Sequence, residues 1–178
     1  MKNEISDTDI EIYSKIRKNV SHFQKESLQK ISDHSLILDI APQDHNTLSG
    51  LDLGGHVFET LDIDPNSGAT YIADITETTV IPSSRFDAVF CTEVLEHVRD
   101  PFRAILEIKR VLKPGGLFFA SSPFNFRIHG PLPDNWRFTE HGWRILLEGF
   151  ESVVVNPLVD EERYLMPFHY TASAQKTK

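Results

Sequence analysis

The sequence predicts an α/β protein built on a doubly wound, mostly parallel sheet. Short apolar segments alternate with helices or loops along the chain, and several of these segments end in acidic residues. The segment at residues 35–41 is continuously apolar up to its acidic end, which is typical of a strand buried on both faces of a parallel sheet. Because ligands of such sheets bind beyond the carboxyl ends of the strands, the acidic strand ends also indicate where a site would lie.

The first half of the chain supplies a helix and four strands. Apolar side chains at helical spacing over residues 5–32 predict an amphipathic helix, which could pack on its own sheet or on a second subunit. Strands are expected at residues 35–41, 57–64, 70–75 and 86–92. A Pro65-Asn-Ser-Gly68 turn separates the second strand from the third.

A second helix follows the fourth strand. Asp100 suits its amino-terminal cap, and Pro101 loses no hydrogen bond at the first helical position. Lys113-Pro-Gly-Gly116 is expected to end this helix. Its apolar face is assigned to Phe102, Ile105, Leu106, Ile108, Val111 and Leu112.

The last third of the chain completes the sheet. A fifth strand is predicted at residues 117–122, and a long loop at 123–139 leads into a helix that carries Trp143. A sixth strand is predicted at residues 150–155, and a last strand lies within residues 163–174.

Composition sets the broad class. The chain has 178 residues, of which 40% are hydrophobic, and this predicts one domain over residues 1–178, with a helical segment at 1–32 and a core at 33–173. The net charge of -8 argues against a general nucleic-acid or membrane binder. A single cysteine leaves no internal disulfide. Without a recognisable signal peptide or an apolar run of membrane length, a cytoplasmic protein is expected, and its oligomeric state stays open.

Three stretches carry a family resemblance. Phe86-Asp-Ala-Val-Phe-Cys-Thr-Glu-Val-Leu-Glu-His-Val98 is followed by Val111-Leu-Lys-Pro-Gly-Gly116 and a hydrophobic strand, and Asp134-Asn-Trp-Arg-Phe-Thr139 precedes a helix. In this spacing, residues 33–173 resemble the small single-domain members of the class I S-adenosylmethionine-dependent methyltransferases. The resemblance implies a Rossmann-like sheet with an antiparallel last strand. It also implies S-adenosylmethionine as cofactor and methyl transfer to an oxygen or nitrogen of a small-molecule substrate, for example a sugar or glycan intermediate.

The same resemblance assigns cofactor-binding positions to several strand ends. Asp39 would help to hold the methionine moiety, and Asp62 would accept hydrogen bonds from both ribose hydroxyls, with Asp64 as a competing candidate. A carboxylate suits that task because it can accept two hydrogen bonds at once. The remaining contacts fall on Asp74 and Ile75 at the adenine, and on Thr92 and Glu93 at the pocket floor.

The glycine loop of the family is missing. The three places that hold glycine in the family are occupied by Ala41, Gln43 and His45, although glycine lets a backbone turn tightly against a ligand. If cofactor still binds, Ala41 is expected at a negative φ and Gln43 is expected to add a side-chain contact. The connections are trimmed as well, with only 15 residues, 42–56, between the first two strands. The alternative is a non-catalytic methyltransferase-like module that serves as a protein-interaction or regulatory subunit.

The loop after the fifth strand supplies candidates for chemistry. His129 is the candidate catalytic base, because proton removal from a hydroxyl calls for a group that titrates near neutrality. Arg127 and Arg137 could hold an anionic group of the substrate. Trp136 could stack on the substrate or simply fix the loop to the sheet.

A metal site is a further possibility that the sequence leaves open, with no metal as the preferred interpretation. Glu93, Glu96 and His97 share one face of a helical turn and could supply three ligands. This residue pattern resembles the metal site of the small-RNA 2′-O-methyltransferases. In those enzymes a later histidine is a further ligand, and this chain has Asn135 at its position. The same residue pattern also occurs in ubiquinone-type O-methyltransferases. His169 is expected to have no chemical role.

Overall fold

The computed structural model describes residues 5–42, 48–51, 54–77 and 79–178. Within this part of the chain, seven strands form one sheet in the order β3-β2-β1-β4-β5-β7-β6. The strands are β1 (Leu36–Ile40), β2 (Val57–Asp62), β3 (Tyr71–Ile72), β4 (Phe86–Thr92), β5 (Leu112–Pro123), β6 (Phe150–Leu158) and β7 (His169–Lys176). The helices are α1 (Asp7–Leu28), α2 (Pro101–Val111) and α3 (Glu140–Leu146), with short 3-10 turns at Leu48–Leu51 and Ile75–Glu77.

The predicted fold class is confirmed. Strands β1 to β5 pair in parallel, and β7 runs antiparallel to both β5 and β6. The chain therefore forms a doubly wound α/β sheet with an antiparallel end. The carboxyl ends of the parallel strands lie along one edge, which is where such sheets bind ligands.

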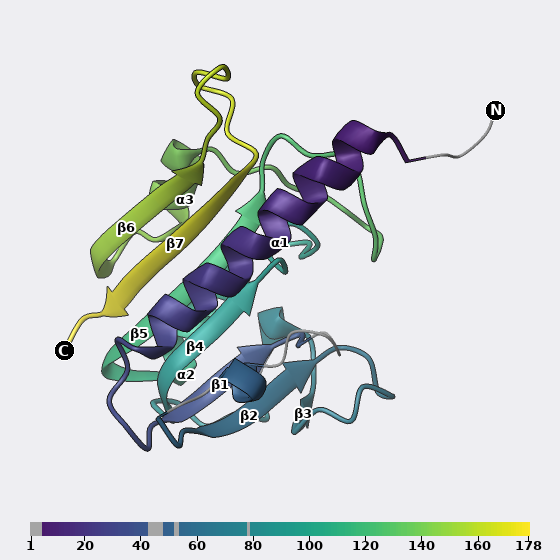
Figure 1. Cartoon of the computed structure of the whole chain (residues 1–178). Coiled ribbons are helices and arrows are strands. Elements are labelled where there is room, and N and C mark those ends of the chain that lie inside the picture. The colour runs from purple at the N-terminus through teal and green to yellow at the C-terminus, as the bar shows by residue number, and fades with distance from the viewer. Residues whose placement is uncertain (1–4, 43–47, 52–53, 78) are drawn as a thin grey trace.

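Helices cover both faces of the sheet. Figure 1 shows α1 lying along β4 and β5 on the side facing the viewer, with α2 behind the sheet. Alternate residues of the strands face the two layers. Phe90 and Phe119 pack with Phe23 of α1, whereas Val89 packs in the same cluster as Ile108 of α2. The predicted amino-terminal helix is thus confirmed, and its apolar face lies on the chain's own sheet.

The second helix is shorter than predicted. It begins as expected, because Oδ1 of Asp100 accepts the amide hydrogen of Arg103 at 3.0 Å. It ends at Val111, however, and β5 begins at the next residue. The assignment of Phe102 and Leu106 to the buried face is wrong, since these side chains are 53% and 57% exposed.

The Lys-Pro-Gly-Gly stretch belongs to β5 rather than to a helix end. A Cβ added to Gly116 would lie 2.9 Å from the carbonyl oxygen of Lys113 and 3.1 Å from that of Asp87. The second glycine is therefore required by the close approach of two backbones at the start of the β4–β5 pairing, where the register shifts.

The connection between β2 and β3 is a bare turn, as the sequence predicts. The backbone amide of Asn66 donates to Oδ1 of Asp64 at 2.8 Å, and the hydroxyl of Ser67 donates to the carbonyl oxygen of Asp64. β3 itself is only two residues long and forms one edge of the sheet.

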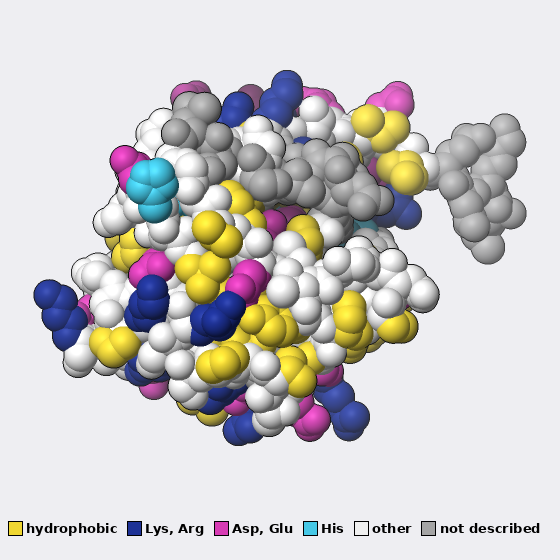
Figure 2. Space-filling model, turned by 90° about the horizontal axis from the view of Figure 1, so that it is seen from below, with side chains coloured by type: hydrophobic (Ala, Val, Ile, Leu, Met, Phe, Trp, Pro, Cys, Tyr) yellow, Lys and Arg dark blue, Asp and Glu magenta, His cyan; other side chains and the backbone are white. Residues whose placement is uncertain are grey.

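The surface carries both signs of charge. On the face seen in Figure 2, Lys and Arg side chains lie next to Asp and Glu, with hydrophobic side chains gathered between them. Among the described residues, no helix combines the length and the hydrophobicity needed to cross a bilayer.

Candidate active site

A cavity of about 430 Å³ opens beyond the carboxyl ends of β1, β2 and β4. This size falls within the usual range for small-molecule sites, which is about 300–1,000 Å³. We call it the large cavity. Its lining residues come from five segments of the chain: Ile40, Ala41, Pro42, Leu61, Asp62, Ile63, Ala73, Asp74, Ile75, Glu93, Val94, His97, Val98, Arg99, Pro131 and Pro133.

Asp62 lies at the end of β2 and lines the large cavity. Its Oδ1 accepts the backbone amide hydrogen of Asp64 at 2.9 Å, and its Oδ2 accepts no hydrogen bond from the described residues. Asp64 instead holds the following turn and does not line the cavity. Of the two competing acids, the structure therefore places Asp62 where it can accept hydrogen bonds from a ligand.

Asp74 and Ile75 lie across the large cavity from β1 and begin the short turn after β3. Oδ1 of Asp74 accepts hydrogen bonds from both the backbone amide and the hydroxyl of Thr76, each at 2.8 Å. These bonds fix the carboxylate at the cavity rim. Both residues therefore line the large cavity, and their contact with an adenine stays a prediction.

Ala41 lies in the left-handed region, with a φ of 51°. The expectation of a negative φ at this position is wrong. Its amide donates to the carbonyl oxygen of Leu61 at 2.7 Å, which ties the end of β1 to β2. The turn after β1 thus keeps a backbone conformation that favours glycine although the glycine is gone. Gln43 and His45 lie outside the described residues.

Asp39 and Thr92 face a narrow recess beneath α1 that also includes Arg17 and Gln24. The side-chain amide of Gln24 donates to the hydroxyl oxygen of Thr92 at 3.2 Å. Burial raises the pKa of Asp39 to about 7, although an amide hydrogen bond from Leu48 acts in the opposite direction. The helix α1 therefore closes the side of the site at which the sequence predicts the methionine moiety.

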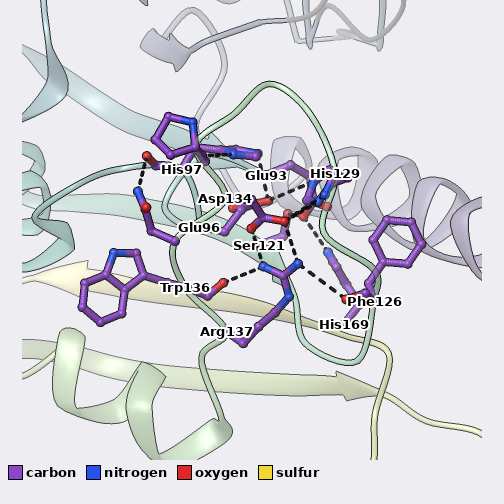
Figure 3. Close-up of polar contacts among 12 residues, drawn as sticks. Glu93, Glu96, His97, Ser121, Phe126, His129, Asp134, Trp136, Arg137 and His169 are labelled. Atoms are coloured by element: carbon purple, nitrogen blue, oxygen red, sulfur yellow. Dashed lines mark hydrogen bonds and ion pairs between the residues drawn. The ribbon is translucent and has the colours of Figure 1, made fainter.

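Glu93 is the first residue after β4 and adopts a φ of 57°. A positive φ is unusual for glutamate, and such strain occurs preferentially at functional sites. Its Oε1 accepts hydrogen bonds from the Ser121 hydroxyl and from Nε2 of His169, both at 2.7 Å (Figure 3). Nδ1 of His169 lies 3.1 Å from the side-chain amide of Asn19 in α1.

His169 has a structural role that the sequence does not indicate. Its side chain is fully buried, and it connects Glu93 to α1. Nothing in the sequence around His169 indicates this contact with Glu93. Only the antiparallel pairing of β7 with β5, which sets His169 opposite Pro123, brings it beside the end of β4.

His129 lies in the loop between β5 and α3 and borders a second, smaller cavity of about 70 Å³. We call it the small cavity. Nδ1 of His129 lies 3.0 Å from Oδ2 of Asp134. The guanidinium of Arg137 bonds to Asp134 and holds the pKa of that carboxyl well below its usual range. Asp134 is thus a permanent acceptor that orients the imidazole, and the other ring nitrogen, Nε2, faces Glu96 (Figure 3).

Arg137 and Trp136 both hold the loop in place. Besides Asp134, the Arg137 guanidinium donates to the carbonyl oxygens of Trp136 and Arg127. Arg137 lines neither the large cavity nor the small cavity. Trp136 donates from its indole nitrogen to the carbonyl oxygen of Val98 at 2.8 Å and stacks on Phe138. These contacts favour the interpretation of Trp136 as an anchor of the loop.

Arg127 lies farther out, 3.7 Å from Asp9 of α1. It borders a groove of about 580 Å³ between the start of α1 and the loop, which we call the outer groove. The groove and the small cavity adjoin each other, since they share the lining residues Tyr13, Phe126, His129 and Gly130. The other groove residues are mainly apolar: Ile5, Asp9, Ile10, Ile128 and Leu132.

Glu96 lies three residues after Glu93, in the non-helical turn that follows β4, and it is fully buried beside these histidines. Neither of its carboxylate oxygens accepts a hydrogen bond from another described residue. Burial, reinforced by the charge of Glu93, raises the pKa of Glu96 well above its usual range. The predicted trio Glu93, Glu96 and His97 does not converge, because Glu93 is held by His169. The residues that converge are Glu96, His97 and His129.

Comparison with known proteins gives matches to methyltransferases. Residues 36–120 match the family model described as "Methyltransferase domain". Over 48 residues, the chain is 46% identical to a ubiquinone biosynthesis O-methyltransferase of Coxiella burnetii. That match covers 26% of this chain and 20% of the enzyme, so the chain corresponds to about a fifth of this curated relative.

Solved structures resemble almost the whole fold. A SAM-dependent methyltransferase from Archaeoglobus fulgidus superposes with a TM-score of 0.72 at 17% identity, covering 90% of this chain and 94% of that one. Phosphoethanolamine N-methyltransferase 2 of Haemonchus contortus, solved with phosphomonomethylethanolamine and S-adenosylhomocysteine, gives a TM-score of 0.63 at 16% identity and covers 87% and 52%.

The fold and the matched family model point to the same class of protein. Residues 36–120, just under half of the chain, match a methyltransferase domain, and the sheet has the fold of solved SAM-dependent methyltransferases. In this chain the β2–β3 link is a bare turn, and Ala41 after β1 adopts a positive φ.

Proposed function

We propose that this chain transfers a methyl group from S-adenosylmethionine to an oxygen atom of a small molecule. One observation carries the proposal: the large cavity and the small cavity share Glu93 and His97. A methyl donor in the large cavity would therefore meet an acceptor that enters from the side of His129. The short match to a ubiquinone biosynthesis O-methyltransferase supports oxygen over nitrogen.

The large cavity suits the donor. When bound, S-adenosylmethionine supplies an electrophilic methyl group on a positively charged sulfur. Asp62 would accept hydrogen bonds from the ribose hydroxyls through Oδ2, while Asp74 and Ile75 would contact the adenine. Asp39, Thr92 and Glu93 would line the methionyl end beneath α1.

His129 has the geometry of a proton acceptor for a hydroxyl group. Asp134 binds Nδ1, which leaves the lone pair of the neutral ring on Nε2, toward the small cavity. This is the arrangement in which an acid fixes the tautomer and direction of a catalytic histidine. A proton taken there turns an alcohol or phenol into a stronger nucleophile for in-line displacement at the methyl group.

The outer groove indicates what the acceptor looks like. The groove leads from solvent to His129 and is lined mainly by apolar side chains. Its charged lining residues are Asp9 and Arg127. Apolar walls favour a substrate with a hydrocarbon or aromatic part over a polyhydroxylated sugar. Arg127 would be the contact for an acidic group on such a substrate.

Binding of S-adenosylhomocysteine, measured by isothermal titration calorimetry, tests the donor site. Asp62→Ala should weaken binding at least tenfold, because it removes a charge-assisted hydrogen-bond acceptor. Asp64→Ala is the matched control, two residues away in a turn outside the cavity, and should bind like the wild type. If the wild type gives no heat at millimolar ligand, the proposal fails and the non-catalytic module stands.

Transfer of radiolabelled methyl groups to a panel of simple phenols and alcohols tests the acceptor side. His129→Gln should lower kcat by about 10²-fold or more while S-adenosylhomocysteine binding stays unchanged. Equal kcat for the variant and the wild type would remove His129 from the chemistry.

A further inference from the structure

Three side chains from two distant segments converge between the two cavities. Glu96 and His97 follow β4, and His129 lies in the loop after β5. Each offers a ligand atom within 4.8 Å of the other two. Oε1 of Glu96 lies 3.8 Å from Nε2 of His97 and 3.9 Å from Nε2 of His129 (Figure 3).

An acceptor beside Nδ1 orients each of the two imidazole rings. Nδ1 of His97 lies 2.9 Å from the carbonyl oxygen of Pro133, which can only accept a hydrogen bond. Nδ1 of His129 lies 3.0 Å from the carboxylate of Asp134, which Arg137 keeps ionised. Both Nδ1 atoms therefore carry the hydrogen, and in the neutral rings the lone pair sits on Nε2. Histidines that bind metals are held in this way, by a carbonyl or carboxylate on the far nitrogen.

No hydrogen bond joins Glu96 to either of the two histidine rings. Distances of 3.8 and 3.9 Å are too long for hydrogen bonds from either ring to Glu96. Glu96 is 0% exposed, and neither of its oxygens accepts a hydrogen bond from another described residue. Two lone pairs and a buried carboxylate aimed at one point are costly unless a proton or a metal cation lies between them, and a metal ion would satisfy all three groups at once.

We propose that Glu96, His97 and His129 bind a divalent transition-metal ion. The chemistry of the ligands sets the class of ion, because imidazole nitrogens suit Zn²⁺ and Co²⁺, whereas Mg²⁺ and Ca²⁺ prefer oxygen ligands. Ligands about 2.1 Å from a tetrahedral zinc ion lie roughly 3.4 Å apart. The two pairs that Glu96 forms with the histidines are a few tenths of an ångström wider, and the two histidine ligand atoms lie within 4.8 Å of each other, so the side chains would close on the ion as it binds.

The proposed ligand set differs from the one that the spacing of the sequence indicates. Oε1 of Glu93 is occupied by Ser121 and His169, which hold this carboxylate outside the cluster. His129 takes its place, although it lies 32 residues after His97 in the sequence. Three protein ligands leave at least one coordination position open, as in catalytic rather than structural zinc sites.

The chemical role of the ion rests on the proposed function, whereas the binding of the ion does not. His97 and His129 both line the small cavity, so an open coordination position faces the predicted acceptor side. There the ion would bind the acceptor hydroxyl and lower its pKa. The lone pair of His129 would then be used for coordination, and the ion would replace this histidine in activating the hydroxyl.

Titration of the purified, untagged and EDTA-treated chain with Co²⁺ tests the site. We expect a 1:1 complex with the visible absorption of Co²⁺ in a nitrogen and oxygen environment. Zn²⁺ should displace Co²⁺ stoichiometrically, and millimolar Mg²⁺ should not. Glu96→Gln and His129→Gln should each weaken Co²⁺ binding at least tenfold, with the fold checked by circular dichroism. His141→Ala, which removes an exposed histidine outside the cluster, should leave binding unchanged.

Each result decides a different question. If the wild type shows no Co²⁺ absorption while it still binds S-adenosylhomocysteine, the metal site is wrong and the proposed function survives. If Co²⁺ binds but S-adenosylhomocysteine does not, the metal site stands and the proposed function fails. Equal displacement of Co²⁺ by Mg²⁺, or Co²⁺ binding that both cluster variants leave intact, would overturn the assignment of the ion or of its ligands. If one of the variants Glu96→Gln and His129→Gln misfolds, Co²⁺ binding by the other variant still tests the site.

Discussion

Nε2 of His169 lies 2.7 Å from Oε1 of Glu93, although 76 residues separate them in the chain. His169 is fully buried, and its other ring nitrogen faces Asn19 of α1. This contact joins the antiparallel end of the sheet to the parallel part at the point where β4 ends. It also holds the strained Glu93 backbone, with its φ of 57°, between the two cavities.

Replacing His169 by alanine should therefore destabilise the fold. The change leaves the buried Glu93 carboxylate with only the Ser121 hydroxyl, and loss of one partner of a buried pair costs about 3 kcal/mol. Urea unfolding at neutral pH measures the difference. His169→Gln, which keeps a side-chain N–H donor, should recover part of the loss, and the exposed His141→Ala should change little. A loss below about 1 kcal/mol for His169→Ala would contradict the structural role.

Asp39 should make stability depend on pH. Burial raises its pKa to about 7 in the fold, whereas the carboxyl titrates near 4 in an unfolded chain. The folded state therefore holds the proton more tightly, so this contribution is complete below about pH 4 and is lost as the pH rises toward 7. The loss amounts to up to about 4 kcal/mol, at about 1.4 kcal/mol per pH unit.

Comparison with Asp39→Asn isolates that effect, because the amide has nearly the same shape and cannot ionise. We expect Asp39→Asn to gain stability relative to the wild type between pH 5 and pH 8. Urea unfolding at the two pH values measures it. A gap between the two proteins that stays constant over this range would show that Asp39 titrates normally.

Ala41→Gly tests the strained turn after β1. A left-handed conformation costs a non-glycine residue roughly 1–2 kcal/mol, and the extra freedom of glycine in the unfolded chain offsets about half of that gain. The variant should therefore be equal to the wild type or up to about 1 kcal/mol more stable. Ala73→Gly is the matched control, since Ala73 lines the same cavity without a positive φ. It should lose about 0.5–1 kcal/mol. The same sign for both variants would contradict this account.

Gly116→Ala should destabilise the start of β5. The added Cβ would press on the carbonyl oxygens of Lys113 and Asp87, and neither backbone can move without shifting a strand. We expect a loss of about 1–3 kcal/mol in thermal or urea unfolding. At Gly142, in α3, an added Cβ meets only ordinary contacts, so Gly142→Ala should be neutral or stabilising by up to about 1 kcal/mol. Equal effects of the two substitutions would refute the steric explanation.

The sequence alone determines the elements and the edge of the sheet at which the site lies. Helix caps and apolar spacing are local, and they predict α1, the start of α2 and most of the strands, because helices and strands place side chains at fixed periods. The acidic strand ends Asp39, Asp62 and Asp74 follow from the same local pattern, since all parallel strands of one sheet end on one edge.

The tertiary structure decides the contacts between segments that are distant in the chain. The pairing of β7 with β5 brings His169 to Glu93, and the path of residues 124–139 brings His129 to Glu96 and His97. Strand register and loop path depend on packing over the whole domain, so helical spacing alone grouped Glu93, and not His129, with Glu96 and His97. The φ of Ala41 could not be predicted either, because an alanine by itself favours a negative φ.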